Sequence, residues 1–221
     1  MSDDIASFVA KRLRHRTNRP EMFERAFTHG SLAHDSYERL EFLGDRVLGL
    51  SIAAALFERY PNEPEGKLSR RYNDLVARET CAEVGRELGI PPLIRLGKQA
   101  REDGANQSDN VVGDVVEAVI GALFLDAGFE AASRFVVEAW TTYLEGQGRA
   151  PKHPKSALQE LAAARGCKNP VYDVVSRTGA HHAPRFEVRV SIAGLGEASA
   201  DGSSKQEAET AAAAALLSNL Q

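Results

Sequence analysis

The chain has 221 residues, and its 27 Lys and Arg against 31 Asp and Glu give a formal net charge of −4. With 43% hydrophobic and 26% charged residues, the composition excludes a disordered or fibrous chain. The negative charge argues at first against nucleic acid as a partner, because phosphate backbones attract basic surfaces. The length suits one large domain or two small ones.

Neither a targeting segment nor a membrane-spanning segment is expected. Basic residues from Lys11 to Arg19 follow a short amphipathic stretch, whereas a secretory signal places them before its apolar run. The apolar segments 47–57 and 111–125 are shorter than a bilayer requires. Cys81 and Cys167 fit neither a disulfide framework nor a metal-binding spacing, which indicates a reducing compartment. We therefore expect a cytoplasmic protein with no membrane partner.

Helical periodicity runs through the first two thirds of the chain. The predicted helices cover residues 5–13, 21–28, 36–60, 68–88, 111–126 and 129–145. Pro61 is expected to end the third helix, and Gly89 is expected to cap the fourth. Because no stretch alternates between apolar and polar residues, residues 1–145 are expected to form an all-α domain.

The composition changes after residue 145. Segment 146–154 contains two Gly and two Pro, which is typical of a linker. Beyond it the pattern predicts a helix over 155–164, strands over 171–177, 186–192 and 197–201, and a final helix ending at Leu220. Ser203 or Ser204, with Glu207 nearby, resembles a capping box at the start of that helix. Residues 155–221 are therefore expected to form a small α+β domain with the order αβββα.

The strongest chemical signal is a set of acids on two apolar helices. Glu38, Glu41 and Asp45 recur at i, i+3 and i+7 and therefore share one helix face. On the second helix, Asp114 and Glu117 lie at i and i+3 among apolar residues and glycines, with no basic residue nearby in the sequence. An unpaired carboxylate in such surroundings would cost several kcal/mol or remain protonated.

The first of these helices is apolar nearly all round. Leu48 and Ile52 continue the acidic face, and the opposite face carries Leu40, Leu43, Val47 and Leu50. Because a helix that is apolar on every side is buried, we expect these carboxylates to lie on a core helix.

Carboxylates without His or Cys suit Mg²⁺ or Mn²⁺ better than Zn²⁺. Facing acids on a helix bundle also occur in di-iron carboxylate proteins, although those use Glu-x-x-His and this spacing is Asp-x-x-Glu. Two structural explanations remain open. The acids could form a solvated face, or they could pair with Arg39, Arg46, Arg70 or Arg71. The residues alone thus predict a divalent-metal site.

Residues 38–45, Glu-Arg-Leu-Glu-Phe-Leu-Gly-Asp, resemble the signature of the ribonuclease III family. Residues 26–31 resemble the Thr-His-x-Ser element that precedes it, and residues 114–117 resemble the family's second acidic element. The second domain resembles a double-stranded-RNA-binding domain, so the resemblance covers almost the whole chain. Gly30 and Arg46 depart from the family pattern, but neither is a metal-ligand position.

The resemblance implies a double-strand-specific endoribonuclease that works as a homodimer in rRNA and mRNA processing. The products would have 5′-phosphate and 3′-hydroxyl ends with short 3′ overhangs. It implies that Mg²⁺, or Mn²⁺ as a substitute, is bound by Glu41, Asp45, Asp114 and Glu117. Asp45 and Glu117 match the residues essential for the reaction, whereas Glu38 and Glu65 match acids near the dimer interface or catalytic valley.

The resemblance also implies RNA contacts from two helices and one loop of the second domain. The matching residues are Ser156, Gln159, Glu160, His182, Ser204 and Lys205. The last two begin a helix, where the dipole and unpaired N–H groups favour phosphate. Gln206 and Glu209 follow where the family often has Lys, so we expect weaker phosphate contact and a shallower salt dependence of RNA binding.

The net charge of neither domain would reveal this function. Residues 1–145 hold 18 Lys and Arg against 24 Asp and Glu, and residues 154–221 hold seven of each sign. A rival interpretation is a double-stranded-RNA-binding protein that kept the fold and lost its metal, but the presence of all four carboxylates argues against it. A di-iron oxidase is a weaker third possibility.

Overall fold

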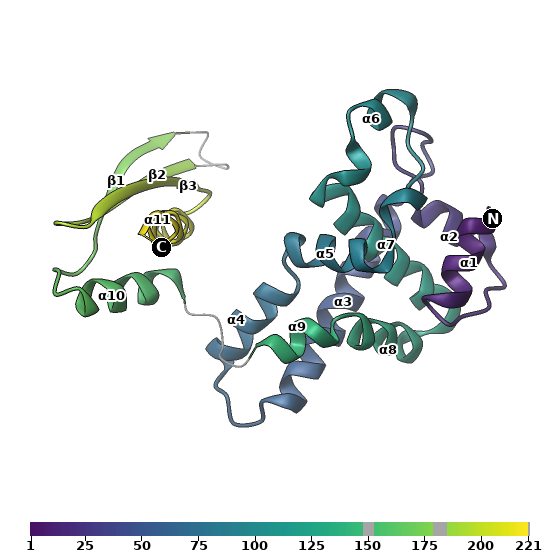
Figure 1. Ribbon diagram of the computed structural model, residues 1–221, viewed down its shortest axis with the longest axis horizontal. Coiled ribbons are helices and arrows are strands. Elements are labelled where there is room, and N and C mark those ends of the chain that lie inside the picture. Colours follow the sequence, from purple (N-terminus) through teal and green to yellow (C-terminus); the bar gives the residue numbers. More distant parts are fainter. Residues whose placement is uncertain (148–152, 179–184, 221) are drawn as a thin grey trace. The chain divides into compact units, whose positions relative to one another are not determined.

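The chain folds into two compact units, Met1–Pro151 and Lys152–Gln221, which are described separately (Figure 1). The computed structural model describes residues 1–147, 153–178 and 185–220. Of the predicted linker 146–154, Gly146 ends one helix and Pro154 begins the next, while residues 148–152 lie outside the described ranges. Within the described ranges, no helix is both long enough and apolar enough to cross a membrane.

The described part of the first unit is built from helices, as the periodicity predicted. In chain order these are α1 (Asp3–Lys11), α2 (Pro20–Ala26), α3 (Glu38–Arg59), α4 (Glu65–Leu75), α5 (Arg78–Leu88), η1 (Pro91–Leu93), α6 (Lys98–Glu102), η2 (Ala105–Gln107), α7 (Asp109–Ala127), α8 (Phe129–Ala139) and α9 (Thr141–Gly146). The predicted spans 5–13, 21–28, 36–60 and 111–126 correspond to α1, α2, α3 and α7. Gly89 ends α5 in the left-handed region at φ 81°, as predicted. The elements η1, α6 and η2 are too short to show a periodic signal.

Helix α7 forms the centre of the first unit. It packs against α2, α3, α5 and α8, and Figure 1 shows it in the middle of these helices. Between Val111 and Leu123, every residue is buried except Asp114 and Glu117, which are partly exposed. A helix that is apolar on all sides belongs in a core. These two acids are therefore the polar exception on an otherwise apolar central helix.

Two predicted helices are each interrupted by a turn. The spacing predicted one helix over 68–88, but the chain turns after Leu75 and forms α4 and α5. It predicted another over 129–145, but the chain turns at Trp140 and forms α8 and α9. The two turns meet, because the buried Trp140 donates from Nε1 to the backbone oxygen of Leu75 at 2.8 Å. Carbonyls at a helix end lack an intrahelical donor. This bond therefore satisfies the Leu75 carbonyl at the end of α4 and holds the turn at Trp140 in place.

Helix α3 is less buried than its composition predicted. Its side chains Phe42, Leu50 and Phe57 are 63%, 58% and 73% exposed, although Leu50 was expected on a buried face. The three lie within about 80° of one another around the helix axis, so they form one stripe. Helix α3 thus turns one side to α7 and presents a second apolar side, called here the α3 stripe (Phe42, Leu50 and Phe57), at the surface of the chain.

The second unit has the predicted order αβββα. Its elements are α10 (Pro154–Ala164), β1 (Val171–Thr178), β2 (Arg185–Ile192), β3 (Gly196–Gly202) and α11 (Lys205–Leu220). The strands form an antiparallel sheet in the order β1-β2-β3, with Tyr172 opposite Val190 and Val188 opposite Ala200. Helix α11 packs against β2, β3 and α10, so one face of the sheet is covered.

The alternating pattern of β2 directs its apolar residues into a small core. Val190 and Ile192 pack there with Leu158 of α10 and with Ala212 and Leu216 of α11. The alanines of α11 let this helix approach closely, and its start touches the end of β3 where only glycine fits. A Cβ on Gly202 would lie 2.4 Å from the backbone nitrogen of Ala208. The Ala-rich run is therefore a packing surface rather than a low-complexity segment.

The predicted capping box is present at the start of α11. The Ser204 Oγ accepts a hydrogen bond from the Glu207 backbone N–H at 3.2 Å. The Glu207 carboxylate in turn accepts one from the Ser203 backbone N–H at 2.8 Å. These bonds satisfy two donors and fix the helix start that is expected to face RNA.

Candidate active site

Helices α3 and α7 cross with their backbones almost in contact. A Cβ on Gly44 of α3 would lie 1.7 Å from the backbone oxygen of Glu117, and a Cβ on Gly121 of α7 would lie 2.3 Å from that of Leu40. No side chain fits at such distances, so the two glycines allow the approach. The crossing places the acids of one helix beside those of the other.

The crossing assembles four carboxylates, called here the acidic cluster (Glu41, Asp45, Asp114 and Glu117). Burial, together with repulsion from the other three carboxylates, raises the pKa of Glu117 to about 8. Burial and neighbouring acids, Asp114 first among them, also raise the pKa of Glu41. Burial raises the pKa of Asp114 as well, although a hydrogen bond from Tyr37 opposes the shift. Shifts of this kind mark acids held together away from water, which is typical of functional sites.

Two neighbouring residues orient members of the acidic cluster. The Tyr37 hydroxyl donates to Asp114 Oδ2 at 3.1 Å, and burial with the charge of Asp114 raises the pKa of this phenol far above its ordinary value. Because its pKa is raised, Tyr37 stays protonated and remains a donor at neutral pH. Arg46 Nη1 donates to Asp45 Oδ2 at 2.5 Å, and its guanidinium stacks on the Phe42 ring at 4.2 Å.

The alternative that arginines neutralise the acids applies in part, because the charge of Arg78 lowers the pKa of Asp114 and a direct ion pair forms at Asp45. Arg46 pairs with it, although both side chains are largely exposed, so the pair contributes little. The buried Arg71 instead binds Glu63 through Nε and Nη2, each at 2.8 Å, and donates from Nη1 to the Gln147 backbone oxygen. The other alternative, a fully solvated acidic face, does not fit the burial that raises the pKa of Glu117.

The four side chains of the acidic cluster offer oxygen donors, and His29 lies near enough for its charge to lower the pKa of Asp114. Cys81 lies close enough for Glu117 to affect it, but burial, reinforced by Glu117, raises its thiol pKa to about 12. The sulfur is therefore protonated and is a poor metal ligand. Within the described ranges, no three His, Cys, Asp or Glu side chains stand close enough together to hold a metal ion.

The other two predicted acids lie outside the acidic cluster. Glu38 begins α3 and is exposed, and its charge contributes to the raised pKa of Glu41. A Cβ on Gly30 would lie 3.2 Å from Glu38 Oε1, so the departure from the family pattern at position 30 leaves room for this carboxylate. Glu65 begins α4, is exposed, and accepts a hydrogen bond from the Ser69 hydroxyl at 2.5 Å.

The sequence did not identify three residues that shape this site. Tyr37 precedes the acidic run, and nothing in its spacing indicates a bond to Asp114, 77 residues later. Gly44 and Gly121 each interrupt a good helical pattern, and an isolated glycine there signals a close contact with another backbone. The two glycines therefore indicate a close backbone contact, but their sequence positions do not show which helix makes it.

In the second unit, the predicted RNA contacts lie on two helices. Ser156, Gln159 and Glu160 are exposed on α10, and Ser204 and Lys205 are exposed at the start of α11. The loop 179–184, which contains His182, lies outside the described residues. Glu209 binds Lys155 Nζ at 2.6 Å and approaches Lys205 Nζ at 3.8 Å. This acid therefore reduces the positive charge at the predicted RNA surface, in line with the weaker phosphate contact expected from the sequence.

The raised pKa of Glu117 predicts how the stability of the metal-free protein depends on pH. The folded state binds this proton more tightly than the unfolded state, whose pKa is near 4.5, so the stabilisation is lost as pH rises toward 8. We expect the melting temperature in EDTA to fall by about 5 °C between pH 6 and pH 8.5. Glu117→Gln should flatten this fall, and a divalent cation should reverse it at pH 8.5. Equal slopes for the two proteins in differential scanning fluorimetry would contradict the assignment of the shift to Glu117.

Two known protein families match the chain, one in each unit. Residues 19–144 match the family described as Ribonuclease-III-like, and residues 154–220 match the double-stranded RNA binding motif. A helical unit with a partly buried acidic cluster, followed by this motif, defines a nuclease that acts on duplex RNA.

Relatives along the whole chain identify the family. Ribonuclease 3 of Zymomonas mobilis is 59% identical over 216 residues, which cover 98% of this chain and 88% of the relative. Ribonuclease 3 of Rhodopseudomonas palustris is 46% identical over 221 residues, which cover 98% and 81%. The chain belongs to the ribonuclease III family and is a double-strand-specific endoribonuclease. Enzymes of this family depend on divalent metal ions.

A solved structure shares the fold of the first unit. The nuclease domain of ribonuclease III from Campylobacter jejuni matches with a TM-score of 0.60 and 29% identity. The match covers 62% of this chain and 96% of that domain. In that protein, a region involved in dimer formation is structurally flexible.

Proposed function

We propose that Glu41, Asp45, Asp114 and Glu117 bind Mg²⁺ and that Asp45 and Glu117 are essential for cleavage. The observation that carries this proposal is the raised pKa of Glu117, since acids that repel one another across a helix crossing favour a cation among them. An all-oxygen donor set is what Mg²⁺ and Mn²⁺ prefer, and the protonated Cys81 thiol offers no competing soft ligand. The donor chemistry of the cluster therefore fits the ion.

The acidic cluster and its two neighbours, Tyr37 and Arg46, have different proposed roles in the site. When bound, a divalent cation supplies positive charge to the scissile phosphate and lowers the pKa of water. The four carboxylates would hold that cation, and the hydrogen bond from Tyr37 fixes the orientation of the Asp114 carboxylate. The hydrogen bond from Arg46 restrains Asp45, and the residues of α7 that flank Asp114 and Glu117 are buried. The products are expected to have 5′-phosphate and 3′-hydroxyl ends with short 3′ overhangs.

A cleavage assay on long duplex RNA tests the metal dependence. We expect complete cutting in Mg²⁺, cutting in Mn²⁺, and none in EDTA, because the acidic cluster repels phosphate unless a cation lies between them. Single-stranded RNA of the same sequence is the control and should remain intact. Binding of the duplex without metal-dependent cutting would favour the rival interpretation of a non-catalytic RNA-binding protein.

We infer that the second unit holds the duplex through the exposed faces of α10 and the start of α11. Ser156, Gln159 and Glu160 are spaced to contact one minor groove, and Ser204 and Lys205 present a helix start to phosphate. His182 would contact a second groove. Both cysteines, Cys81 and Cys167, are free thiols, which favours a reducing compartment. We therefore propose that the enzyme matures rRNA and mRNA in the cytoplasm.

We propose that the α3 stripe (Phe42, Leu50 and Phe57) joins two copies of the chain. Large exposed apolar patches on a soluble domain mark interaction surfaces. Around the helix axis the stripe adjoins the face that carries Glu38, Glu41 and Asp45, so a second copy seated on it would lie beside the acidic cluster. A homodimer of this kind would bring two sites to one RNA duplex, one for each strand.

A charge placed in the α3 stripe tests the dimer. We expect Leu50→Asp to sediment as a monomer at micromolar concentration, because dimerisation would bury the new carboxylate without a partner. Leu125→Asp is the matched control, since Leu125 is a 43% exposed apolar residue at the end of α7 and lies off the stripe. This control should remain a dimer in sedimentation equilibrium. A dimeric Leu50→Asp protein would show that the two copies meet elsewhere.

A further inference from the structure

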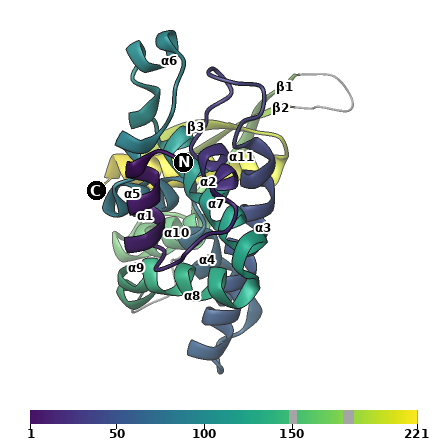
Figure 2. The same cartoon turned by 90° about the vertical axis from the view of Figure 1, so that its right-hand side faces the viewer.

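A basic segment near the start of the first unit takes no part in the acidic cluster. Residues 11–19 carry Lys11, Arg12, Arg14, His15, Arg16 and Arg19 and contain no acid. Residues 1–145 as a whole hold 24 acids against 18 Lys and Arg, so this concentration of positive charge runs against the composition around it. Helices α1 and α2, which flank the segment, face the viewer in Figure 2.

The basic segment is fixed to the end of α7. His15 Nε2 binds Asp126 Oδ2 at 2.7 Å, and the Asp126 side chain is only 4% exposed. Arg19 Nη1 donates to the backbone oxygen of Leu125 at 3.2 Å. The backbone of Arg14 adopts φ 49°, a left-handed conformation that L residues other than glycine seldom adopt. Such a conformation persists only where the surrounding structure imposes it.

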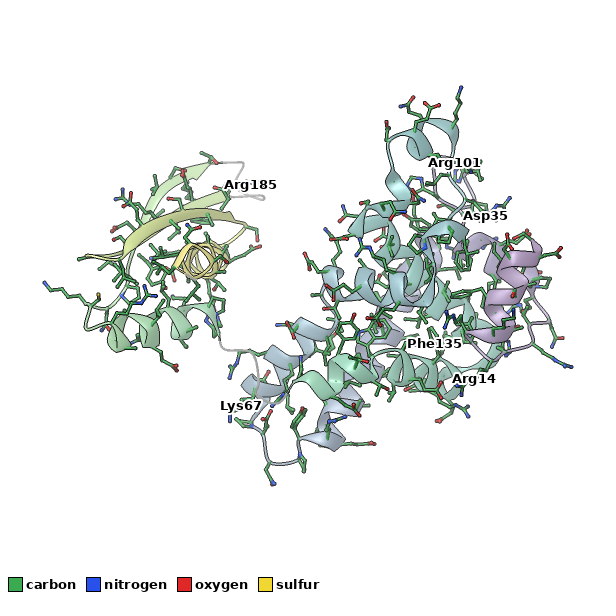
Figure 3. All side chains as sticks on the ribbon, in the orientation of Figure 1. Arg14, Asp35, Lys67, Arg101, Phe135 and Arg185 are labelled. Carbon is green, nitrogen blue, oxygen red and sulfur yellow. The ribbon has the colours of Figure 1, made fainter. Side chains whose placement is uncertain are left out.

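A cavity of about 320 Å³ lies between this segment, α7 and α8. Its apolar lining includes Leu13 and Phe135, which are 8% and 7% exposed, and its charged lining includes Arg12, Arg14 and Arg134. Figure 3 labels Arg14 and Phe135 in this part of the first unit. The cavity is therefore lined by buried apolar residues and by arginines that are exposed at the surface.

The positive charge of this cavity is not neutralised from within. The only acid that lines it among the described residues is Glu138, which lies 3.7 Å from Arg14 Nη1 and is more than half exposed. With His15 counted as neutral, the three arginines and Glu138 leave a formal charge of +2. Within the described ranges, neither Arg12 nor Arg134 forms an ion pair.

We propose that this cavity binds a small molecule with two or more linked phosphate groups. Guanidinium groups bind phosphate oxygens through paired N–H donors, and several arginines around one opening suit several adjacent phosphates. The volume is at the lower end of that of small-molecule sites, and an RNA duplex is far too wide to enter it. The apolar floor at Leu13 and Phe135 gives a nucleoside a surface to pack on. The site is independent of the acidic cluster and of the function proposed for it.

Isothermal titration calorimetry on the full chain tests the cavity with sodium pyrophosphate and with ADP. EDTA and low ionic strength remove metal-bridged binding at the acidic cluster and limit screening. We expect both titrants to bind, while orthophosphate binds at least about tenfold more weakly. Tighter binding of ADP than of pyrophosphate would place the nucleoside on the apolar floor, and equal binding would show that the phosphates alone are recognised.

Substitutions distinguish the cavity from general attraction to a basic surface. Arg12→Ala and Arg134→Ala should each weaken pyrophosphate binding by about fivefold, and Glu138→Gln should strengthen it by about twofold. Arg16→Ala is the matched control, because Arg16 is an exposed cation of the same segment that does not line the cavity. The proposal is wrong if wild-type protein binds neither titrant, or if Arg16→Ala weakens binding as much as Arg134→Ala.

Discussion

Glu117→Gln is expected to slow the cleavage of duplex RNA by about 10³-fold, which corresponds to roughly 4 kcal/mol of lost transition-state stabilisation. The change keeps the size of the side chain and removes the charge that would bind the cation. The fold should survive, because a pKa of about 8 means that the metal-free protein already carries this group mostly protonated at neutral pH. Single-turnover cleavage of an end-labelled duplex in Mg²⁺ measures the effect.

A binding assay and a matched variant separate catalysis from folding. Duplex RNA binding in EDTA should be unchanged in Glu117→Gln, because the RNA contacts of the second unit do not involve this residue. Glu130→Gln is the control, since Glu130 is an exposed acid in the first turn of α8 and should leave cleavage unchanged. A Glu117→Gln protein that cuts at the wild-type rate in Mg²⁺ would refute the assignment of this carboxylate to the site.

The acids could be predicted from the sequence because their surroundings were anomalous. Asp114 and Glu117 stand on a helix that is otherwise apolar, and the structure buries that helix at the centre of the first unit. Local periodicity is enough to place both on one face. Which residues meet them across the helix crossing depends on the packing of α3 on α7, so the bond from Tyr37 to Asp114 appears only in three dimensions.

Periodicity failed where the packing of the whole unit overrode local preference. Residues 68–88 and 129–145 each have continuous helical spacing, yet each is interrupted by a turn, and the Trp140 indole of one turn donates to the Leu75 carbonyl at the other. The composition of α3 predicted burial on every side within one chain, but Phe42, Leu50 and Phe57 are exposed. Exposed apolar residues of this kind can be buried by a second copy of the chain rather than by its own core.

The net charge of −4 is a misleading guide to RNA binding, because the positions of the charges matter more than their sum. Some of the acids lie in the acidic cluster, where the proposed cation would offset them, and another, Glu209, pairs with lysines at the predicted RNA surface. The basic residues of segment 11–19 are concentrated in one part of the first unit, and Arg12, Arg14 and His15 among them line a cavity. An acidic protein can thus hold a polyanion and bind small anions at separate places.

Gly44→Ala is expected to destabilise the protein by about 3 kcal/mol or more and to lower its melting temperature by about 10 °C. The new Cβ would lie 1.7 Å from the oxygen and 2.5 Å from the carbon of the Glu117 backbone carbonyl. Backbone atoms of a central helix cannot rotate away as a side chain can, so α3 and α7 must separate. The separation would also move Glu41 and Asp45 away from Asp114 and Glu117, so cleavage should fall even below the melting temperature.

Gly66→Ala is the matched control for this effect. Gly66 also lies in a helix, α4, but the nearest atom to its added Cβ is the Arg70 Nη1, 3.8 Å away at the end of a flexible side chain. Alanine favours a helix over glycine by up to about 1 kcal/mol, so this variant should be as stable as the wild type or slightly more so. Thermal unfolding followed by circular dichroism compares the two. Equal melting temperatures for Gly44→Ala and Gly66→Ala would mean that the close crossing of α3 and α7, on which the geometry of the acidic cluster depends, is not required by the fold.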